Sequence, residues 1–387
     1  MEGTEMKKTL WTMLVMLLFG MTLQAQNKEA QLKHIREMYA QAKEQIAQNG
    51  KNGRAPLDMK ILINDGTYIS DDFVVNDVTE LHFYFNKYRI NSDLDYPDAS
   101  SCYFITEQWG ANGHTRYREI LFDANEGGLL FTYMKAETHA GFTVETRYYY
   151  DGEGNLIDQK HKVGGHDTEP GTHSWNTADS EKNLAEACLN IFEDLMNHQT
   201  DLTVKDREIA KVTPKAERMK YIRSTYSQAK EKIAKNDKSE LPLDVQIVIR
   251  DQTWGPPETT ELKFYFDAVT DQVEPDAVSV DNYCYFISEH HHHNNMGPDN
   301  YGEYLFAPKS HDLIFSYSCG KEEGETREWR YYYDERGKCI EVKSVAEEVD
   351  YGFSDKINAK HYLKIFKALF DRPMTSRSEE RRVGKEC

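Results

Sequence analysis

The sequence predicts an α+β fold made by tandem duplication of one unit: a helix, an antiparallel β-meander of about 6–7 strands and a second helix. Three observations lead to this prediction. Similar segments recur in the same order roughly 180 residues apart, a spacing typical of a duplicated domain. Segments of alternating apolar and polar residues, separated by turn residues, follow one another as strands. Amphipathic helical patterns open and close each half.

The internal repeat is the strongest of these signals. Ile35-Arg36 with Tyr39 recurs as Ile222-Arg223 with Tyr226. Further matched segments are Pro56-Leu57-Asp58 and Pro242-Leu243-Asp244, Phe83-Tyr84-Phe85 and Phe264-Tyr265-Phe266, Cys102-Tyr103-Phe104-Ile105 and Cys284-Tyr285-Phe286-Ile287, and Arg147-Tyr148-Tyr149-Tyr150-Asp151 and Arg330-Tyr331-Tyr332-Tyr333-Asp334. Because the matches keep their order, we expect each half to be a domain with its own sheet and its own core.

The first half shows the expected elements in order. Its opening helix has an apolar stripe, formed by Ile35, Met38, Tyr39, Ala42 and Ile46. Strands are expected at residues 59–63, 81–85, 102–107, 117–122, 129–134, 146–150 and 155–160. The closing helix has its stripe at Leu184, Ala187, Cys188, Ile191 and Leu195, and Ile365, Phe366, Leu369 and Phe370 mark its counterpart in the second half. Short connections between most of the strands favour antiparallel pairing.

The chain ends differ from the two expected domains. Residues 1–25 combine Lys7 and Lys8 with an apolar run and a small residue, the pattern of a cleaved signal peptide. The apolar run is shorter than the roughly 20 residues that cross a bilayer, although a retained anchor is the alternative. The domains are expected at 26–199 and 216–373, with a linker at 200–215. Residues 374–387 form a tail that from Arg377 resembles a sequencing or cloning artefact.

The composition limits the classes of partner. The formal net charge is −18, which repels phosphate backbones, so we expect no nucleic-acid partner. We also expect no membrane span after signal cleavage, since no later segment is apolar enough. The signal peptide predicts export, to the periplasm or the exterior of a Gram-negative bacterium.

Cys102 and Cys284 open the same expected strand in both halves and are interpreted as small buried hydrophobes.

A run of four histidines is the sharpest local signal for a ligand. His290, His291, His292 and His293 stand where the first half has Gln108-Trp109-Gly110. Neutral imidazoles bind zinc, copper or nickel, so the run is a candidate metal site. The alternative is a solvated loop that captures a divalent metal adventitiously, and no cofactor is otherwise expected. A second group, His161, His166, Asp167 and His173, is interpreted as a surface loop.

Two further sets of side chains are candidates for chemistry or recognition. The matched glutamates Glu107, Glu119, Glu289 and Glu303 lie on strands expected to be neighbours, and paired carboxylates serve as acid and base in glycoside hydrolysis. The matched tyrosines Tyr148, Tyr150, Tyr331 and Tyr333 point to one side of their strands and form a candidate binding face. Ordinary strand composition is the alternative explanation for the tyrosines.

These observations favour a binding function over catalysis. The sequence has no phosphate-cradling loop, nucleophile elbow or zinc-protease motif. We therefore expect a secreted or periplasmic bacterial two-domain binding or interaction protein whose partner is a glycan, a peptide or an envelope protein. The alternative hypothesis is a hydrolase of an envelope or extracellular polymer that uses paired glutamates, and a third is a structural envelope protein.

Overall fold

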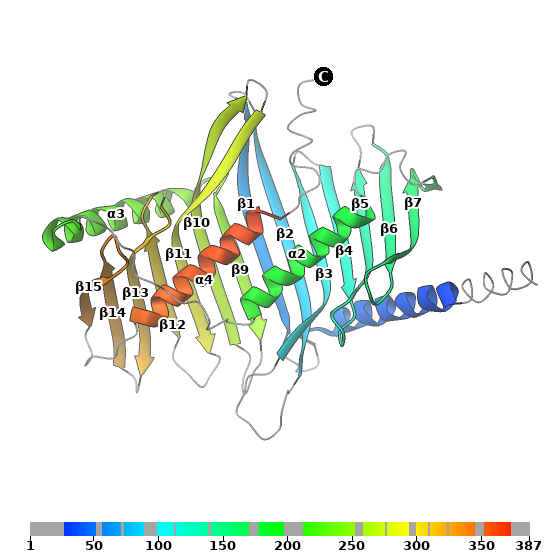
Figure 1. Cartoon of the computed structure of the whole chain (residues 1–387), viewed down its shortest axis with the longest axis horizontal. Helices are drawn as coiled ribbons and strands as arrows, with labels where there is room; N and C mark the ends of the chain where they lie inside the picture. The colour runs from blue at the N-terminus through cyan, green and yellow to red at the C-terminus, as the bar shows by residue number, and fades with distance from the viewer. Residues whose placement is uncertain are drawn as a thin grey trace, which may run out of the picture.

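A computed structural model describes most of the chain between residues 27 and 372. The described ranges are 27–51, 56–70, 73–88, 99–111, 114–137, 141–169, 177–196, 212–251, 258–274, 277–293, 299–308, 310–322, 325–344 and 352–372. The predicted signal peptide, residues 200–211 of the predicted linker and the predicted tail lie outside these ranges. One antiparallel sheet dominates the structure, with helices on both of its faces (Figure 1).

The sheet has 15 strands. The strands of the first half are β1 (Asp58–Ser70), β2 (Phe73–Tyr88), β3 (Ala99–Ala111), β4 (His114–Phe122), β5 (Leu129–Glu137), β6 (Thr143–Tyr150), β7 (Leu156–Val163) and β8 (His166–Asp167). Those of the second half are β9 (Asp244–Asp251), β10 (Glu258–Glu274), β11 (Ala277–His293), β12 (Asn300–Phe306), β13 (Leu313–Glu322), β14 (Glu325–Tyr333) and β15 (Cys339–Ser344). The helices are an N-terminal helix at residues 27–48, α2 (Ala178–Met196), α3 (Lys215–Asn236) and α4 (Gly352–Phe370).

The prediction of two separate helix–meander–helix units is wrong. The strand order runs from β15 back to β9, then from β1 to β8, so both halves belong to one continuous sheet. They join where β1 pairs with β9 in antiparallel register. The closing helices α2 and α4 then pack over a single core to which both halves contribute. The sequence pattern indicates which strands are neighbours within each half. It does not show that the first strands of the two halves, β1 and β9, pair with each other.

The properties of the strands β1 and β9 explain why the two halves join into one sheet. Ile61 pairs directly with Ile247, and both side chains are fully buried. In separate units, β1 and β9 would each be an open sheet edge whose unpaired backbone groups flank apolar side chains. Pairing removes both edges at once. The register is symmetric about the Ile61–Ile247 pair, with Asp58 opposite Arg250 and Asn64 opposite Asp244.

The two faces of the sheet are covered differently (Figure 1). On one face, α2 and α4 share a core with the central strands. On the opposite face, the N-terminal helix packs at one end against Phe104 and Phe131, and α3 packs at the other end against Phe286 and Phe315. These two smaller cores are separate from each other. The central part of this second face has polar side chains such as Lys60 instead of a helix.

Matched register shifts place two consecutive aromatic residues of β3, and two of β11, on the same face of the sheet. The register shifts between Tyr84 and Phe85 in β2, and between Tyr265 and Phe266 in β10. In each case the partner strand has one extra residue, Tyr103 in β3 and Tyr285 in β11, and such a bulge re-aims side chains. Tyr285 and Phe286 therefore both lie in the core under α3.

None of the helices in the described part of the chain combines the length and the apolar character that a membrane span requires.

Candidate functional site

Two matched pockets lie between the opening helix of each half and the outer strands of the sheet. The first pocket has a volume of about 350 Å³ and is lined by Ile35, Arg36, Tyr39, Glu119, Phe131, Tyr133, Arg147 and Tyr149. The second pocket has a volume of about 460 Å³ and is lined by Ile222, Arg223, Tyr226, Ser227, Phe315, Tyr317, Arg330 and Tyr332. Seven lining positions carry the same residue type in both pockets.

Helical and strand periodicity bring these side chains together. Ile35 and Tyr39 are four residues apart and therefore share one face of the N-terminal helix. Arg147 and Tyr149 are two residues apart on β6, so both point to the face that the N-terminal helix covers. Tyr133 is the direct partner of Arg147 on β5. Ion pairs hold the helices above the sheet at matched places, Lys28 with Asp158 at 2.9 Å and Lys215 with Glu341 at 3.2 Å.

A buried carboxylate binds the pocket tyrosine of each opening helix, and in the first half this carboxylate also lines the pocket. Glu119 accepts hydrogen bonds from Tyr39, from Tyr117 at 2.8 Å and from Lys43 Nζ at 2.8 Å. Glu303 accepts the matched set in the second half, from Tyr226 at 2.6 Å, Tyr301 at 2.7 Å and Lys230 at 2.8 Å.

Each of these carboxylates is the centre of a structural network. Burial and the hydrogen bond to Glu119 raise the pKa of Tyr39, and burial and Glu303 do the same for Tyr226. The tyrosine hydroxyls therefore stay protonated and donate. Each carboxylate is tied to a lysine and two tyrosines, which fixes the helix to the sheet beside the pocket.

The inner arginine of each pocket is held in a fixed orientation. Arg147 donates from Nη2 to Glu145 at 2.8 Å, and its guanidinium lies over the ring of Tyr133 at 5.1 Å from the centroid. Arg330 repeats both contacts, with Glu328 at 2.7 Å and Tyr317 at 5.1 Å. A guanidinium has five N–H donors, so one bond to a glutamate leaves donors for a ligand.

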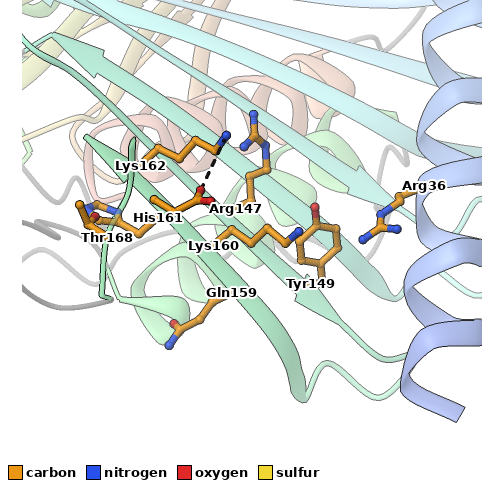
Figure 2. Close-up of a pocket in the computed structure, with 9 residues that line it drawn as sticks. Arg36, Arg147, Tyr149, Gln159, Lys160, His161, Lys162 and Thr168 are labelled. Carbon is orange, nitrogen blue, oxygen red and sulfur yellow. Dashed lines mark ion pairs between the residues drawn. The ribbon is translucent and has the colours of Figure 1, made fainter. Parts of the chain in front are cut away.

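The first pocket continues into a larger cavity over the edge of the sheet. This cavity has a volume of about 660 Å³ and shares Arg36, Arg147 and Tyr149 with the first pocket. Figure 2 shows Lys160 and Lys162 of β7 along it, with Lys162 paired to Asp167 at 3.7 Å. The two arginines and two lysines outnumber the single acidic residue in the lining. The lining of this cavity beside the first pocket therefore has a net positive charge.

The four tyrosines predicted as a binding face lie elsewhere. Tyr148, Tyr150, Tyr331 and Tyr333 are buried on the side of the sheet that α2 and α4 cover. The intervening Tyr149 and Tyr332 line the pockets instead. The sequence analysis also missed Arg36, Arg223, Arg147 and Arg330 as site residues. The available signal was the presence of the same arginines beside apolar stripes in both halves.

The structure does not bring the candidate glutamates together as pairs. Glu107 pairs with Arg118 across β3 and β4, whereas Glu119 pairs with Thr106. Neighbouring residues on a strand point to opposite faces, so Glu107 lies under α2 and Glu119 under the N-terminal helix. Glu289 and Glu303 are separated in the same way. The geometry therefore gives no support to a catalytic pair within either half.

Glu107 and Glu289 instead anchor two different buried networks. Arg118 donates to Glu107 and, at 2.9 Å, to Glu181 of α2, while Arg372 donates to Glu107 at 3.0 Å. Arg372 follows α4, so this network joins the end of the second half to the first. In the second half, Glu289 accepts hydrogen bonds from Tyr304 at 2.9 Å, from Tyr362 and from His291.

Asp355 at the start of α4 provides a pH-dependent prediction. Burial raises its pKa to about 6, although Ser316 donates a hydrogen bond to it at 2.6 Å. Because the pKa is higher in the folded state than in the unfolded state, the carboxylate destabilises the fold as pH rises through about 6. We expect Asp355→Asn to raise the free energy of unfolding by up to about 3 kcal/mol near pH 8, and by about half as much near pH 5.

Urea denaturation at both pH values measures this effect. Asp371→Asn serves as the control, because Asp371 is exposed after the same helix. An equal gain at the two pH values would contradict the assignment to Asp355 ionisation.

The histidine run alternates between the two faces of β11. His290 and His292 lie on the face that α3 partly covers, together with Glu261 of β10. His291 points to the other face, where Thr260 is 2.9 Å from its Nδ1. The side chain of His293 lies outside the described residues. Of the other predicted histidine group, His161 is buried beside Thr146, His166 and Asp167 form the exposed β8, and His173 lies outside the described residues.

The cysteines of the described residues are all unbridged. Cys102, Cys188 and Cys284 are buried, and Cys319 and Cys339 are partly exposed. Burial raises the pKa of Cys102, Cys188 and Cys284, that of Cys188 to about 11. These buried thiols stay protonated at neutral pH, which opposes a nucleophilic role.

No protein-family model matches the chain, and no curated protein sequence matches it.

Proposed function

We propose that this protein is an exported binding protein with two matched sites for an acidic glycan. The observation that carries the proposal is the recurrence of one arginine–tyrosine lining in the first and second pockets. A fold needs apolar residues at the contact between helix and sheet, but it does not need an exposed arginine and a half-buried arginine around it. Their presence in both halves is explained by a shared ligand chemistry.

The lining fits a sugar unit that bears a carboxylate. Tyr149 presents a ring and Tyr133 a ring stacked with Arg147, and aromatic rings pack against the apolar faces of sugar rings. Arg36 and Arg147 supply planar donor groups, which match carboxylate geometry. Volumes of about 350 and 460 Å³ lie at the lower end of the range for small-ligand pockets.

Charge supports an anionic ligand and ranks the two sites. The chain as a whole has a net charge of −18, so its surface repels an acidic polymer except where basic residues gather. Lys160 adds positive charge beside the first pocket, whereas the charge of Lys162 is offset by Asp167. At the matched place in the second half, Lys343 is paired with Glu341 at 3.6 Å. We therefore expect the first pocket to bind more tightly than the second.

The continuous sheet places both pockets on the same face. Arg147 lies on β6 and Arg330 on β14, which are 11 strand positions apart in the sheet. With about 4.8 Å between neighbouring strands, the two sites are separated by roughly 50 Å. A polymer long enough to span this distance gains affinity by occupying both sites.

Calorimetric titration with oligouronates tests the proposal. We expect two sites per chain, and we expect Arg147→Ala to weaken the tighter one by about 10–100-fold, since a charge-assisted hydrogen bond is lost. Arg330→Ala should weaken the other site, and the double variant should bind neither. Lys238→Ala removes the same charge from an exposed turn and serves as the control.

Two parallel titrations identify the ligand class. Neutral oligosaccharides should bind far more weakly, because they lack the group that pairs with the arginines. Tighter binding of a polyglutamate peptide than of any oligouronate would assign the sites to acidic peptides and overturn the glycan proposal. Unchanged oligouronate affinity in the double variant would remove the pockets as the binding sites.

A further inference from the structure

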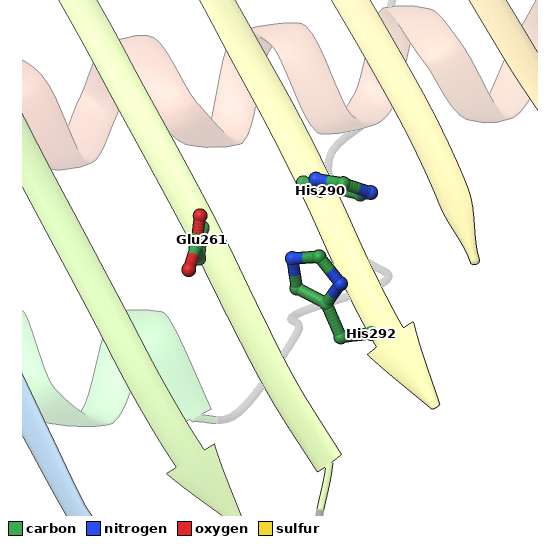
Figure 3. A group of neighbouring side chains, drawn as sticks. All are labelled: Glu261, His290 and His292. Atoms are coloured by element: carbon green, nitrogen blue, oxygen red, sulfur yellow. The ribbon is translucent and has the colours of Figure 1, made fainter. Parts of the chain in front are cut away.

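Three side chains with metal-ligand chemistry converge on the strands β10 and β11, away from both pockets. The possible ligand atoms of Glu261, His290 and His292 all lie within 4.8 Å of one another. Figure 3 shows the two imidazoles on β11 and the carboxylate on the adjacent β10. Within the described part of the chain, no other group of three histidine, cysteine or acidic residues has this geometry.

Strand geometry explains the convergence. His290 and His292 are two residues apart on β11, so both point to the same face of the sheet. Glu261 is the direct cross-strand partner of His290, which brings the side chains of the pair close together. The rings of His290 and His292 are 3.8 Å apart between centroids. The histidine run is therefore part of a paired strand at these positions, and its ligands have a defined arrangement.

We propose that Glu261, His290 and His292 bind one divalent transition-metal ion, with Zn²⁺ as the probe of choice. Two imidazole nitrogens and one carboxylate oxygen are a typical zinc ligand set, and a fourth position remains for water or another ligand. The carboxylate of Asp299 lies 3.7 Å from Nδ1 of His292, where it can orient the ring or supply a further ligand. The two histidines are half-buried and Glu261 is exposed, so an ion can reach the site from solvent.

The first half lacks this site, which makes it an internal comparison. Gln108 and Gly110 stand at the positions of His290 and His292, and Glu80 stands at the position of Glu261. Glu80 is paired with Lys60 at 2.9 Å, whereas the position of that lysine in the second half is Gln246. The second half thus has both histidines and has no lysine at the place that would neutralise the carboxylate. The metal site is independent of the two pockets, which both halves share.

Zinc titration of the full chain, followed by calorimetry, tests the assignment. We expect one Zn²⁺ ion per chain with micromolar or tighter affinity. His290→Gln, which introduces the residue of the first half, and His292→Gln should each weaken binding on the order of 100-fold. Glu261→Gln should weaken it as well. His291→Gln should leave the affinity within about threefold, because this ring points to the other face of the sheet.

The His291 variant separates a built site from a flexible histidine tract. Equal loss of zinc affinity in the His290, His291 and His292 variants would overturn the proposal, as would binding weaker than millimolar in the unaltered protein. Since His291 contacts the buried Glu289, circular dichroism must show that His291→Gln is folded. If it is not, His34→Gln on the exposed face of the N-terminal helix replaces it as the control. The absorption spectrum of bound Co²⁺ provides a second readout, and we expect the intense visible bands of a four-coordinate ion.

Discussion

Replacing Ile247 by aspartate is expected to unfold both halves of the protein together. Ile247 is fully buried where β9 meets β1, and it belongs to the core that α2 and α4 share. An ionised carboxylate at this place has no partner and loses its hydration, which costs more than about 5 kcal/mol. Domains of ordinary stability have a free energy of unfolding of about 5–15 kcal/mol, so the substitution removes most or all of it.

Hydrogen exchange resolved by peptide measures this effect in each half separately. We expect peptides from β3 to β5 to lose protection along with peptides from β11 to β13. Val248→Asp is the matched control, because Val248 is the next residue of β9 and is half-buried on the opposite face. Retained protection of the first half in Ile247→Asp would show that the halves fold independently, contrary to the single-sheet architecture.

Replacing Arg118 by methionine is expected to destabilise the protein by about 3–5 kcal/mol. Arg118 is buried between the carboxylates of Glu107 and Glu181, and its guanidinium lies 4.4 Å from the ring centroid of Trp109. Methionine keeps the contact with the indole but leaves two buried carboxylates to share one remaining arginine, Arg372. The midpoint and slope of urea denaturation give the change in free energy of unfolding.

A second substitution distinguishes lost charge balance from lost packing. In Arg118→Met with Glu181→Gln, one positive and one negative charge are removed, and Glu107 keeps its bond to Arg372. We expect this double variant to recover most of the stability. If the single variant lost less than about 1 kcal/mol of its free energy of unfolding, the ion pairs of Arg118 would contribute no more than ordinary surface ion pairs. That result would contradict the role of Arg118 in balancing buried charge. A double variant no more stable than the single one would indicate packing as the cause.

The joined sheet also determines how the proposed binding sites behave. Each pocket needs its own helix and outer strands, but their spacing is set by the strands between them. Because β1 and β9 pair over seven residues and α2 packs against α4, the two sites cannot swing relative to each other as linked domains do. A ligand that spans both pockets therefore meets a fixed spacing.

Local patterns made several parts of the fold predictable. The apolar stripe that contains Ile35 and Ala42 correctly predicts a helix, and the alternation around Phe83 correctly predicts a strand. Short connections correctly predict antiparallel pairing of consecutive strands. The alternation failed at Tyr103 and Phe104, which are consecutive on β3 but lie in the same core, because the sequence gives no sign that the register shifts there.

The candidate sites were harder to predict than the strands. The alternation placed Tyr149 on the opposite side of its strand from Tyr148 and Tyr150. It did not show which side faces the core under α2 and which side faces a pocket. It identified the histidine run, but Glu261 joins that run only through the pairing of β10 with β11. It treated Glu107 and Glu119 as neighbours, which they are in strand order, although their side chains lie on opposite faces of the sheet.

The sequence by itself determined most of the elements and their order, because helical and strand periodicities are local properties of neighbouring residues; the short strand β8, which was interpreted as a loop, is an exception. It also determined that the two halves use the same side chains at the same places. Only the tertiary structure decided that the halves form one sheet, that one core lies beneath both closing helices, and that arginines and tyrosines of the opening helix and outer strands form the pockets. These features depend on which edges pair and which face each helix covers, and such contacts join residues far apart in the chain.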